Sequence, residues 1–267
     1  MFRLGDYLRS RGYYEQNISL LNSLGSSRQS YPQVKRISLS GLGTVYSALG
    51  VYPKAIYLYN ESLNILPQNR DANLLDNPRI RAFIQRSLGI AYLNQGEIEQ
   101  SQEKFNKSVF YQRESLEITR SIRDRKGEGR TLGGLGHAYY VQGNYDEAIV
   151  YANEYLKVAR ETQDRRSEGQ ALGILGWAHY GKKNFQEAVK FQKESLEIAR
   201  QIKDRALEGQ ALSNLGDALL QKGSIEDAQK ILFNAVEVSI LRTKFEQVLS
   251  VKPWFGRRQD LIYQSQE

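Results

Sequence analysis

The 267-residue chain contains no cysteine, one methionine and two histidines. Without cysteine it can form no disulfide, no thiolate metal site and no cysteine nucleophile. The two histidines, His137 and His179, have no evident third ligand, so we predict no metal site. Neither the phosphate-binding pattern G-x-x-x-x-G-K-[ST] nor the nucleophile pattern G-x-S-x-G occurs. These absences predict a protein that is not an enzyme and that needs no cofactor.

Long apolar runs are also missing. The first residues show no basic region followed by an apolar stretch, so no secretory signal is expected. No window reaches about 18 uninterrupted apolar residues, so no membrane span is expected. The sequence therefore predicts a cytoplasmic protein that does not cross a membrane.

The charge balance is basic, with a net charge of +7. A positive field can attract nucleic acid or anionic lipid. Basic and acidic side chains are interleaved, however, as in residues 123–128, and do not form one focused patch. Nucleic-acid binding is therefore kept only as an alternative function.

An internal repeat is the main feature of the sequence, and such a period decides the fold class. The segment that begins Glu-Gly recurs every 40 residues, at 128–136, 168–176 and 208–216. A second segment recurs with it, at 143–148, 183–188 and 223–228. Fainter copies lie upstream and share an anchor glycine with the clear ones. The anchors are Gly5, Gly43, Gly89, Gly136, Gly176 and Gly216, spaced by 38, 46, 47, 40 and 40 residues.

Each repeat reads as two helices joined by a glycine-containing turn. Apolar residues recur at steps of three and four in both halves, as in Leu132, Leu135 and Tyr139. Asn144 and Asn184, each with a glutamate three residues later, predict capping boxes on the second helices. Aspartates predict caps on the first helices, at Asp124, Asp164 and Asp204. The small residues Gly136 and Ala148 predict close approach of the paired helices.

The upstream repeats are irregular. Seven extra residues predict a longer second helix over about 98–122, with Ser101 in place of the expected alanine. Residues 66–78 contain two prolines and form either an ordinary long turn or an insertion that contacts a partner. At the start, Gly5, Gly12 and Tyr14 copy the anchor, turn and second helix of a partial repeat.

The pattern L-G-x-A-Y-x-x-x-G-x-Y/F-x-E-A resembles the tetratricopeptide repeat. The resemblance covers nearly all of residues 1–240 and is most specific from 128 to 240. The 40-residue period resembles the long-helix subclass found in bacterial signalling proteins beside CHAT or NB-ARC domains, and in animal adaptors of the LGN type. It implies an all-α, right-handed superhelical solenoid of antiparallel helix pairs, with about five full units and one partial unit. Residues 241–267 are expected to form a capping helix, over about 243–251, and a tail.

The resemblance implies that the first helices line a concave groove that holds a partner. Carried over position by position, the groove residues are Arg130, His137, Tyr140, Gln170, Trp177, Tyr180, Gln210, Asn214 and Asp217. Amide side chains there can both donate to and accept from an extended backbone. Trp177 is expected in the groove, with packing between repeats as the alternative, whereas Tyr139 and Tyr145 are expected to pack. Only Asn214 and Arg130 match the LGN-type peptide grip, so the same ligand class is not implied.

The predicted function is a non-catalytic scaffold that binds a peptide or partner protein. One alternative is a helical-repeat protein that binds nucleic acid. Another is a fragment of a larger signalling protein without its effector domain. Because open helix faces at the ends of the array are apolar, end-to-end self-association is a further expectation.

Overall fold

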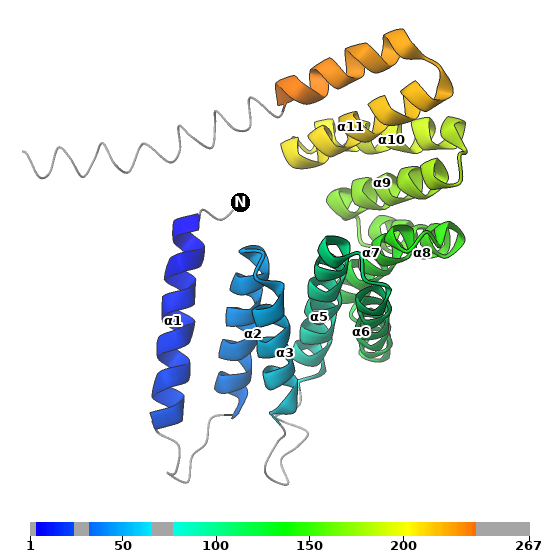
Figure 1. The fold of residues 1–267 in the computed structure, drawn as a ribbon. Coiled ribbons are helices and arrows are strands. Elements are labelled where there is room, and N and C mark those ends of the chain that lie inside the picture. The colour runs from blue at the N-terminus through cyan, green and yellow to red at the C-terminus, as the bar shows by residue number, and fades with distance from the viewer. Residues whose placement is uncertain (1–3, 24–31, 66–76, 239–267) are drawn as a thin grey trace, which may run out of the picture. The chain divides into compact units, whose positions relative to one another are not determined.

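A computed structural model describes residues 4–23, 32–65 and 77–238, all of them in helices or in the turns that join helices (Figure 1). The chain divides into two compact units, residues 1–163 and 164–267, here called the N-terminal and C-terminal units. The all-helical fold class is thereby confirmed for the described residues. The predicted cap over 243–251 and Pro67 of the predicted 66–78 loop lie outside them, whereas Pro78 is described as the first residue of a helix.

In its described residues, the N-terminal unit has one helix followed by three helical pairs. The helices are α1 (Leu4–Ser23), α2 (Pro32–Ala48), α3 (Tyr52–Asn64), α5 (Pro78–Glu99), α6 (Gln102–Ser121), α7 (Arg125–Val141) and α8 (Tyr145–Glu161). The first helices of the pairs are α2, α5 and α7, and the second helices are α3, α6 and α8. Each helix packs against the next one in the sequence.

The C-terminal unit contains two pairs. Its helices are α9 (Arg165–Gly181), α10 (Phe185–Gln201), α11 (Arg205–Lys222) and a final helix over residues 225–238. One core cluster of this unit is formed by alanines and branched residues from α10, α11 and the final helix, including Leu212, Leu215 and Ala228, and Tyr180 of α9 packs against it.

The predicted N-caps are confirmed for the first helices but not for the second helices. The carboxylates of Asp124 and Asp164 each accept a hydrogen bond at 3.0 Å from a backbone N–H three residues on. Asp204 accepts two such bonds at 3.1 Å. Asn144 and Asn184 stand at N-cap positions, but neither side chain caps its helix. The capping-box prediction for the second helices is therefore wrong, and their entry is fixed by the preceding backbone turn, in which Asn144 N–H donates to the Tyr139 carbonyl at 2.9 Å.

The anchor glycines make room for a large side chain of the paired helix. A Cβ atom on Gly43 would lie 2.8 Å from the ring of Tyr59, and one on Gly176 would lie 2.3 Å from the Gln192 amide. The same relationship holds for Gly89 with Gln112 and for Gly216 with Leu232, whereas nothing lies within 4 Å of a Cβ position on Gly5. At these four anchors a large side chain of the second helix fills the space above the glycine, and the close approach of helices at Gly136 and Ala148 stays a prediction.

The partial repeat at the start is a single helix. α1 runs without a break through Gly12, so the turn expected at that glycine is absent. Tyr14 lies on the same helix and packs on α2, where a Cβ atom on Gly41 would lie 2.4 Å from its ring. α1 therefore packs on α2 as the second helix of a preceding repeat would, and the first helix of such a repeat is not among the described residues.

The seven extra residues of the α5–α6 pair are shared between both helices. Gly89 is followed 12 residues later by the N-cap Ser101, against 8 residues from Gly136 to Asn144, so four of the extra residues lie before α6. The remaining three lengthen α6, which begins at Gln102 and not at 98 as predicted. Gly96 is therefore not a turn glycine. It is buried inside α5, where a Cβ atom would lie 2.8 Å from Phe105.

A carboxylate held by two arginines supports the junction between repeats. In the C-terminal unit, the side chain of Glu208 is only 8% exposed and accepts from Arg200 Nε at 3.1 Å and from Arg205 Nη1 at 2.8 Å. The same arrangement recurs in the N-terminal unit with Glu128, Arg120 and Arg125. Because the arginines belong to the end of a second helix and the start of the next first helix, the carboxylate ties two repeats together. The glutamate that marks each repeat in the sequence is thus a structural residue.

Candidate partner-binding surface

In each unit the first helices carry a strip of exposed side chains at matching repeat positions. The clearest position is the sixth residue before each anchor glycine, which is exposed in all five first helices. These residues are Ile37, Phe83, Arg130, Gln170 and Gln210. The strip is apolar in α2 and α5 and polar in α7, α9 and α11. The exposed residue therefore changes from apolar to polar along the chain, while its position in the repeat stays the same.

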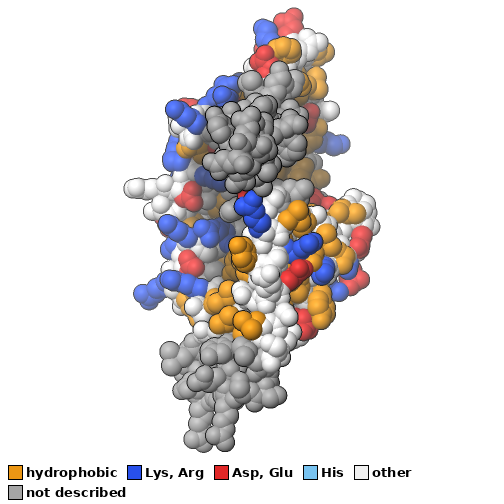
Figure 2. Space-filling model, turned by 90° about the vertical axis from the view of Figure 1, so that its left-hand side faces the viewer, with side chains coloured by type: hydrophobic (Ala, Val, Ile, Leu, Met, Phe, Trp, Pro, Cys, Tyr) orange, Lys and Arg blue, Asp and Glu red, His pale blue; other side chains and the backbone are white. Residues whose placement is uncertain are grey.

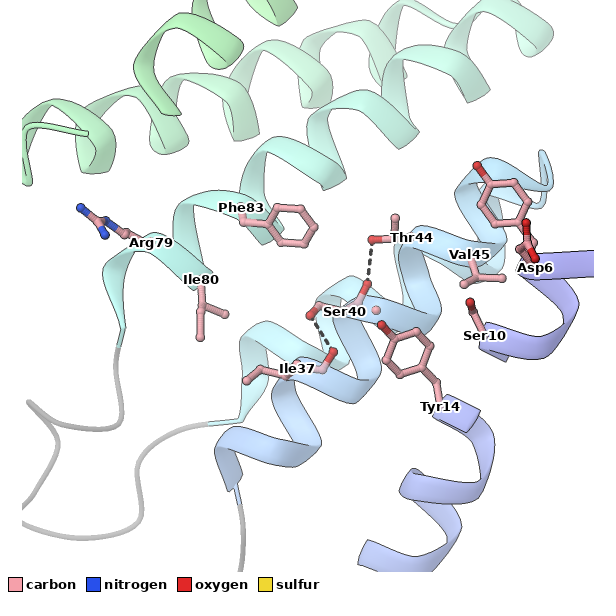
Figure 3. A pocket seen from close by; sticks show the side chains of 12 residues that line it. Asp6, Ser10, Tyr14, Ile37, Ser40, Thr44, Val45, Arg79, Ile80 and Phe83 are labelled. Carbon is pink, nitrogen blue, oxygen red and sulfur yellow. Dashed lines mark hydrogen bonds between the residues drawn. The ribbon is translucent and has the colours of Figure 1, made fainter. Parts of the chain in front are cut away.

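A pocket of about 570 Å³ lies in the apolar part of this strip, within the N-terminal unit. Its walls come from α1, α2 and α5 (Figure 3). The lining residues are Asp6, Tyr7, Ser10, Tyr14, Ile37, Ser40, Gly41, Thr44, Val45, Arg79, Ile80 and Phe83. A volume of this size is within the range of sites that hold a small ligand or a large side chain.

Two hydroxyl groups in the pocket, those of Ser40 and Thr44, already form hydrogen bonds within the protein. Ser40 donates to the Ile37 carbonyl at 3.0 Å, and Thr44 donates to the Ser40 carbonyl at 3.0 Å. Tyr59 then donates to Thr44 at 3.2 Å. The side chains of Ile37 and Phe83 remain 48% and 38% exposed. The pocket thus offers mainly apolar contact to a ligand.

Charged groups lie at both ends of the pocket. In Figure 3, Arg79 from α5 and Asp6 from α1 are at opposite ends, with Phe83, Ile37 and Tyr14 between them. An elongated ligand in this pocket would meet a guanidinium at one end and a carboxylate at the other.

Sequence reasoning placed the site in α7, α9 and α11 and missed this pocket. The signal was present, since the offsets that gave Arg130 and His137 around Gly136 give Ile37 and Thr44 around Gly43. The upstream repeats are divergent, and only the structure shows that α1 closes one side of the pocket.

Three predicted groove residues lie together on α7. Arg130 is exposed, whereas His137 and Tyr140 are half-buried. The Tyr140 ring packs against Tyr145 of the paired helix, with centroids 5.9 Å apart. Burial lowers the pKa of His137, and the charge of Glu97 opposes that effect. Of the three, Arg130 is the most available to a partner.

The neighbouring glycines of α7 lie under side chains of second helices. A Cβ atom on Gly133 would lie 2.7 Å from the ring of Tyr155, and one on Gly134 would lie 1.7 Å from Gln112 Oε1. These two positions are thus close-packing sites.

The predicted residues of α9 are Gln170, Trp177 and Tyr180, all in the C-terminal unit. Gln170 is exposed and the two aromatic residues are half-buried. The Tyr180 ring meets Phe185 of the paired helix edge-on at 5.6 Å. The partial exposure of Trp177 leaves both its predicted groove position and the packing alternative open.

The predicted residues of α11 are Gln210, Asn214 and Asp217. Gln210 and Asp217 are exposed, whereas Asn214 is half-buried. The Nδ2 atom of Asn214 is enclosed and has no hydrogen-bond partner among the described residues. This amide is a candidate donor to a bound backbone.

Neither a metal site nor a membrane span is found in the described part of the chain. Within residues 4–23, 32–65 and 77–238, no group of three or more His, Asp or Glu side chains could hold a metal ion. No helix in these ranges is long and apolar enough to cross a membrane.

A sequence model of the tetratricopeptide repeat family matches residues 87–161 and 165–238, more than half of the chain. The matched ranges contain the three clearest repeats and the α5–α6 pair. A search of curated proteins found no significant match.

Solved structures with this arrangement of helices share little sequence with the chain. BtubC from P. vanneervenii has a TM-score of 0.69 at 16% identity, over 89% of this chain and 92% of that one. A Rap protein complexed with Competence and Sporulation Factor has a TM-score of 0.67 at 15% identity, over 90% and 67%. NprR in complex with its cognate peptide NprX has a TM-score of 0.58 at 14% identity, over 92% and 75%. At these identities the likeness supports the fold.

Proposed function

Because the chain belongs to the tetratricopeptide repeat family, we propose that it is a non-catalytic scaffold that binds a peptide or an extended segment of a partner protein. The binding surface is the exposed strip of the first helices. The observation that carries this proposal is the apolar pocket of α1, α2 and α5, in which Ile37 and Phe83 are exposed without a covering element in the described chain.

An exposed apolar hollow gains nothing for folding, and apolar surface releases water when a ligand covers it. Bulky apolar side chains in a concave site are also the usual anchors of peptide recognition. Two proteins with the same fold are known in complexes, the Rap protein with Competence and Sporulation Factor and NprR with its cognate peptide NprX. These neighbours support a peptide ligand without identifying it.

The polar part of the strip provides a second contact region, as the sequence predicts. Gln170, Gln210 and the enclosed Asn214 amide lie in the C-terminal unit and can hydrogen-bond an extended backbone. Trp177 is the predicted aromatic anchor of this region. We propose that the pocket of the N-terminal unit takes an apolar side chain of a partner and that, as a separate contact region, the polar residues of the C-terminal unit hydrogen-bond an extended backbone.

Selection from a random peptide display library on the immobilised protein tests the proposal. Selected peptides are then titrated against wild type, Phe83→Ala and Tyr57→Ala. Tyr57 is the matched control, since it is 61% exposed on the second helix α3. We expect Phe83→Ala to weaken binding at least about tenfold and Tyr57→Ala to have little effect.

Failure to select any peptide, or equal binding by all three proteins, would overturn the proposal. A parallel titration with single-stranded and duplex nucleic acid covers the alternative function. Binding that falls steeply with salt would favour that alternative.

A further inference from the structure

The wall of the apolar pocket that α1 forms carries a carboxylate. α1 contributes the lining residues Asp6, Tyr7, Ser10 and Tyr14. In Figure 3, Asp6 and Ser10 lie next to Val45 of α2 at one end of the pocket, whereas Arg79 of α5 lies at the other end. The two ends of the pocket therefore differ in charge, and the α1 end is the negative one.

Two contacts with α2 set the orientation of α1. The ring of Tyr14 lies over Gly41, where a Cβ atom would be 2.4 Å from Tyr14 Cζ and 2.8 Å from its hydroxyl oxygen. The Tyr46 hydroxyl donates a hydrogen bond to Glu15 at 3.1 Å. Together these contacts fix the rotation of α1 about its own axis, so that Asp6 is held at the pocket.

The side chains of this wall favour a cation. Arg11, the neighbouring basic residue of α1, is already paired, since its Nε lies 3.8 Å from Glu15. Asp6 is exposed, and a carboxylate can accept from several donors at once. Tyr7 and Tyr14 are half-buried on the same wall, and the faces of aromatic rings also attract cations. A cationic group of a ligand is therefore favoured at the α1 end, and an anionic group is not.

This wall is a feature of the chain and not of the repeat. α1 lies outside residues 87–161 and 165–238, which the family model matches. Figure 2, which faces the side where α1 lies in Figure 1, shows exposed hydrophobic side chains with charged side chains of both signs near them. A ligand that approaches this side from solvent meets apolar surface and charge together.

We propose that Asp6, Tyr7 and Ser10 form a subsite for a cationic side chain, and that the partner is a peptide in which lysine or arginine lies close to a bulky apolar residue. This inference rests on the proposed function and names its ligand class. The charged head of the lysine or arginine meets the Asp6 carboxylate in a charge-assisted hydrogen bond.

The rest of the pocket fits the same ligand. The aliphatic stem of a lysine or arginine side chain lies along the apolar wall while its head stays at the rim. The bulky apolar residue of the peptide packs against Ile37 and Phe83, which are exposed in the pocket. Repulsion from Arg79 keeps the cation at the α1 end, so the peptide has one direction in the pocket.

Peptides from the display selection provide the probes, and we expect them to combine an aromatic or large aliphatic residue with a lysine or arginine close by. Each peptide is made with acetylated and amidated ends, so that only its side chains carry charge. The basic residue is kept, changed to norleucine to remove the charge, or changed to glutamate to reverse it. Fluorescence anisotropy measures binding to wild type, Asp6→Asn, Asp6→Lys and the control Glu61→Gln, which removes an exposed carboxylate from the second helix α3.

The basic peptide should bind Asp6→Asn about three- to tenfold more weakly than wild type, because one charge-assisted contact is lost. The norleucine peptide should not distinguish these two proteins, and Glu61→Gln should bind the basic peptide within about 1.5-fold of wild type. Asp6→Lys should reverse the preference and bind the glutamate peptide more tightly than the basic one. A purely structural role of Asp6 in the first turn of α1 would weaken all three peptides alike, so the reversal separates a ligand contact from a folding defect.

Three outcomes would overturn the cation subsite and leave the proposed function intact. The selected peptides could bind through Phe83 with no preference for basic residues. Asp6→Asn could bind the basic peptide as tightly as wild type. The Asp6 variants could lose affinity equally for all three peptides, which would make the role of Asp6 structural. Failure to select any peptide would instead contradict the proposed function itself, and this inference with it.

Discussion

Gly89 in α5 lies directly under the side chain of Gln112 in α6, so that a Cβ atom on the glycine would be only 2.3 Å from Gln112 Cγ. The same atom would be 3.0 Å from the Ser108 carbonyl oxygen. The close contact with α6 thus requires glycine at this point of α5. The reason is the lack of space for a side chain and not the backbone conformation, because Gly89 lies inside a regular helix.

The first prediction follows from this contact. Gly89→Ala should lower the free energy of unfolding by about 1–3 kcal/mol, because the methyl group overpacks the α5–α6 interface. Gly12→Ala is the matched control, since Gly12 lies inside α1 with nothing near its Cβ position. It should raise stability by up to about 1 kcal/mol through helix propensity. Urea unfolding of both variants measures the effect, and a shift of both in the same direction would contradict this explanation.

A second prediction concerns Gln112 itself. The side chain is fully buried, and its Oε1 atom has no hydrogen-bond partner among the described residues. Its Nε2 donates to Ser108 at 3.0 Å. Gln112→Met keeps the length of the side chain and removes the unsatisfied oxygen, so we expect stability to stay equal or to rise by about 1 kcal/mol. A loss of more than about 2 kcal/mol in thermal or urea unfolding would show that the amide makes a needed contact.

The third prediction concerns the carboxylate that joins repeats. Glu208→Gln should destabilise the C-terminal unit by about 1–3 kcal/mol, because Arg200 and Arg205 lose their shared charged partner. Both arginines are half-exposed, which limits the effect. Glu226→Gln, on an exposed position of the final helix, serves as the control and should change stability little. Equal effects of the two substitutions in denaturant unfolding would contradict the role of Glu208.

A fourth prediction concerns pH. Burial lowers the pKa of His137 and of His179 below the ordinary value of 6.5. As pH falls, the two imidazoles therefore bind protons in the unfolded chain before they do so in the folded protein. The free energy of unfolding should then decline from about pH 7.5 towards pH 5.5. His179 stacks on Phe191 at 5.2 Å, with Lys182 and Lys190 adding to the decrease in its pKa. Unfolding of the double variant His137→Gln, His179→Gln should depend less on pH in this interval, and an unchanged slope would refute the assignment.

The sequence predicts the repeats well where the period is regular. Leu132, Leu172 and Leu212 repeat at 40-residue steps and are all fully buried, and the aspartate caps lie where expected. Prediction from periodicity fails where the repeat is longer, as at Gly96. Spacing alone cannot tell whether the extra residues lengthen a helix or a turn. It also fails at Gly12, where a turn glycine and a helical glycine look alike in sequence.

The candidate site was less predictable for a different reason. Exposure of Arg130 and Gln210 follows from their register, which the repeat reveals. The pocket depends on the packing of α1 against α2 and on Phe83, which belong to the divergent part of the chain. The partners of half-buried aromatic residues, such as Tyr180 with Phe185, depend on the angle between helices, which no residue pattern specifies.

Photo-crosslinking with a selected peptide tests the central claim most directly. The photoreactive amino acid p-benzoylphenylalanine replaces either Ile90, exposed on the first helix α5, or Tyr57, exposed on the second helix α3. If the first helices form the binding surface, the peptide is captured from position 90 and not from position 57, and unlabelled peptide competes with the reaction. Capture from position 57 alone would contradict this account and place the partner on the opposite face of the repeats.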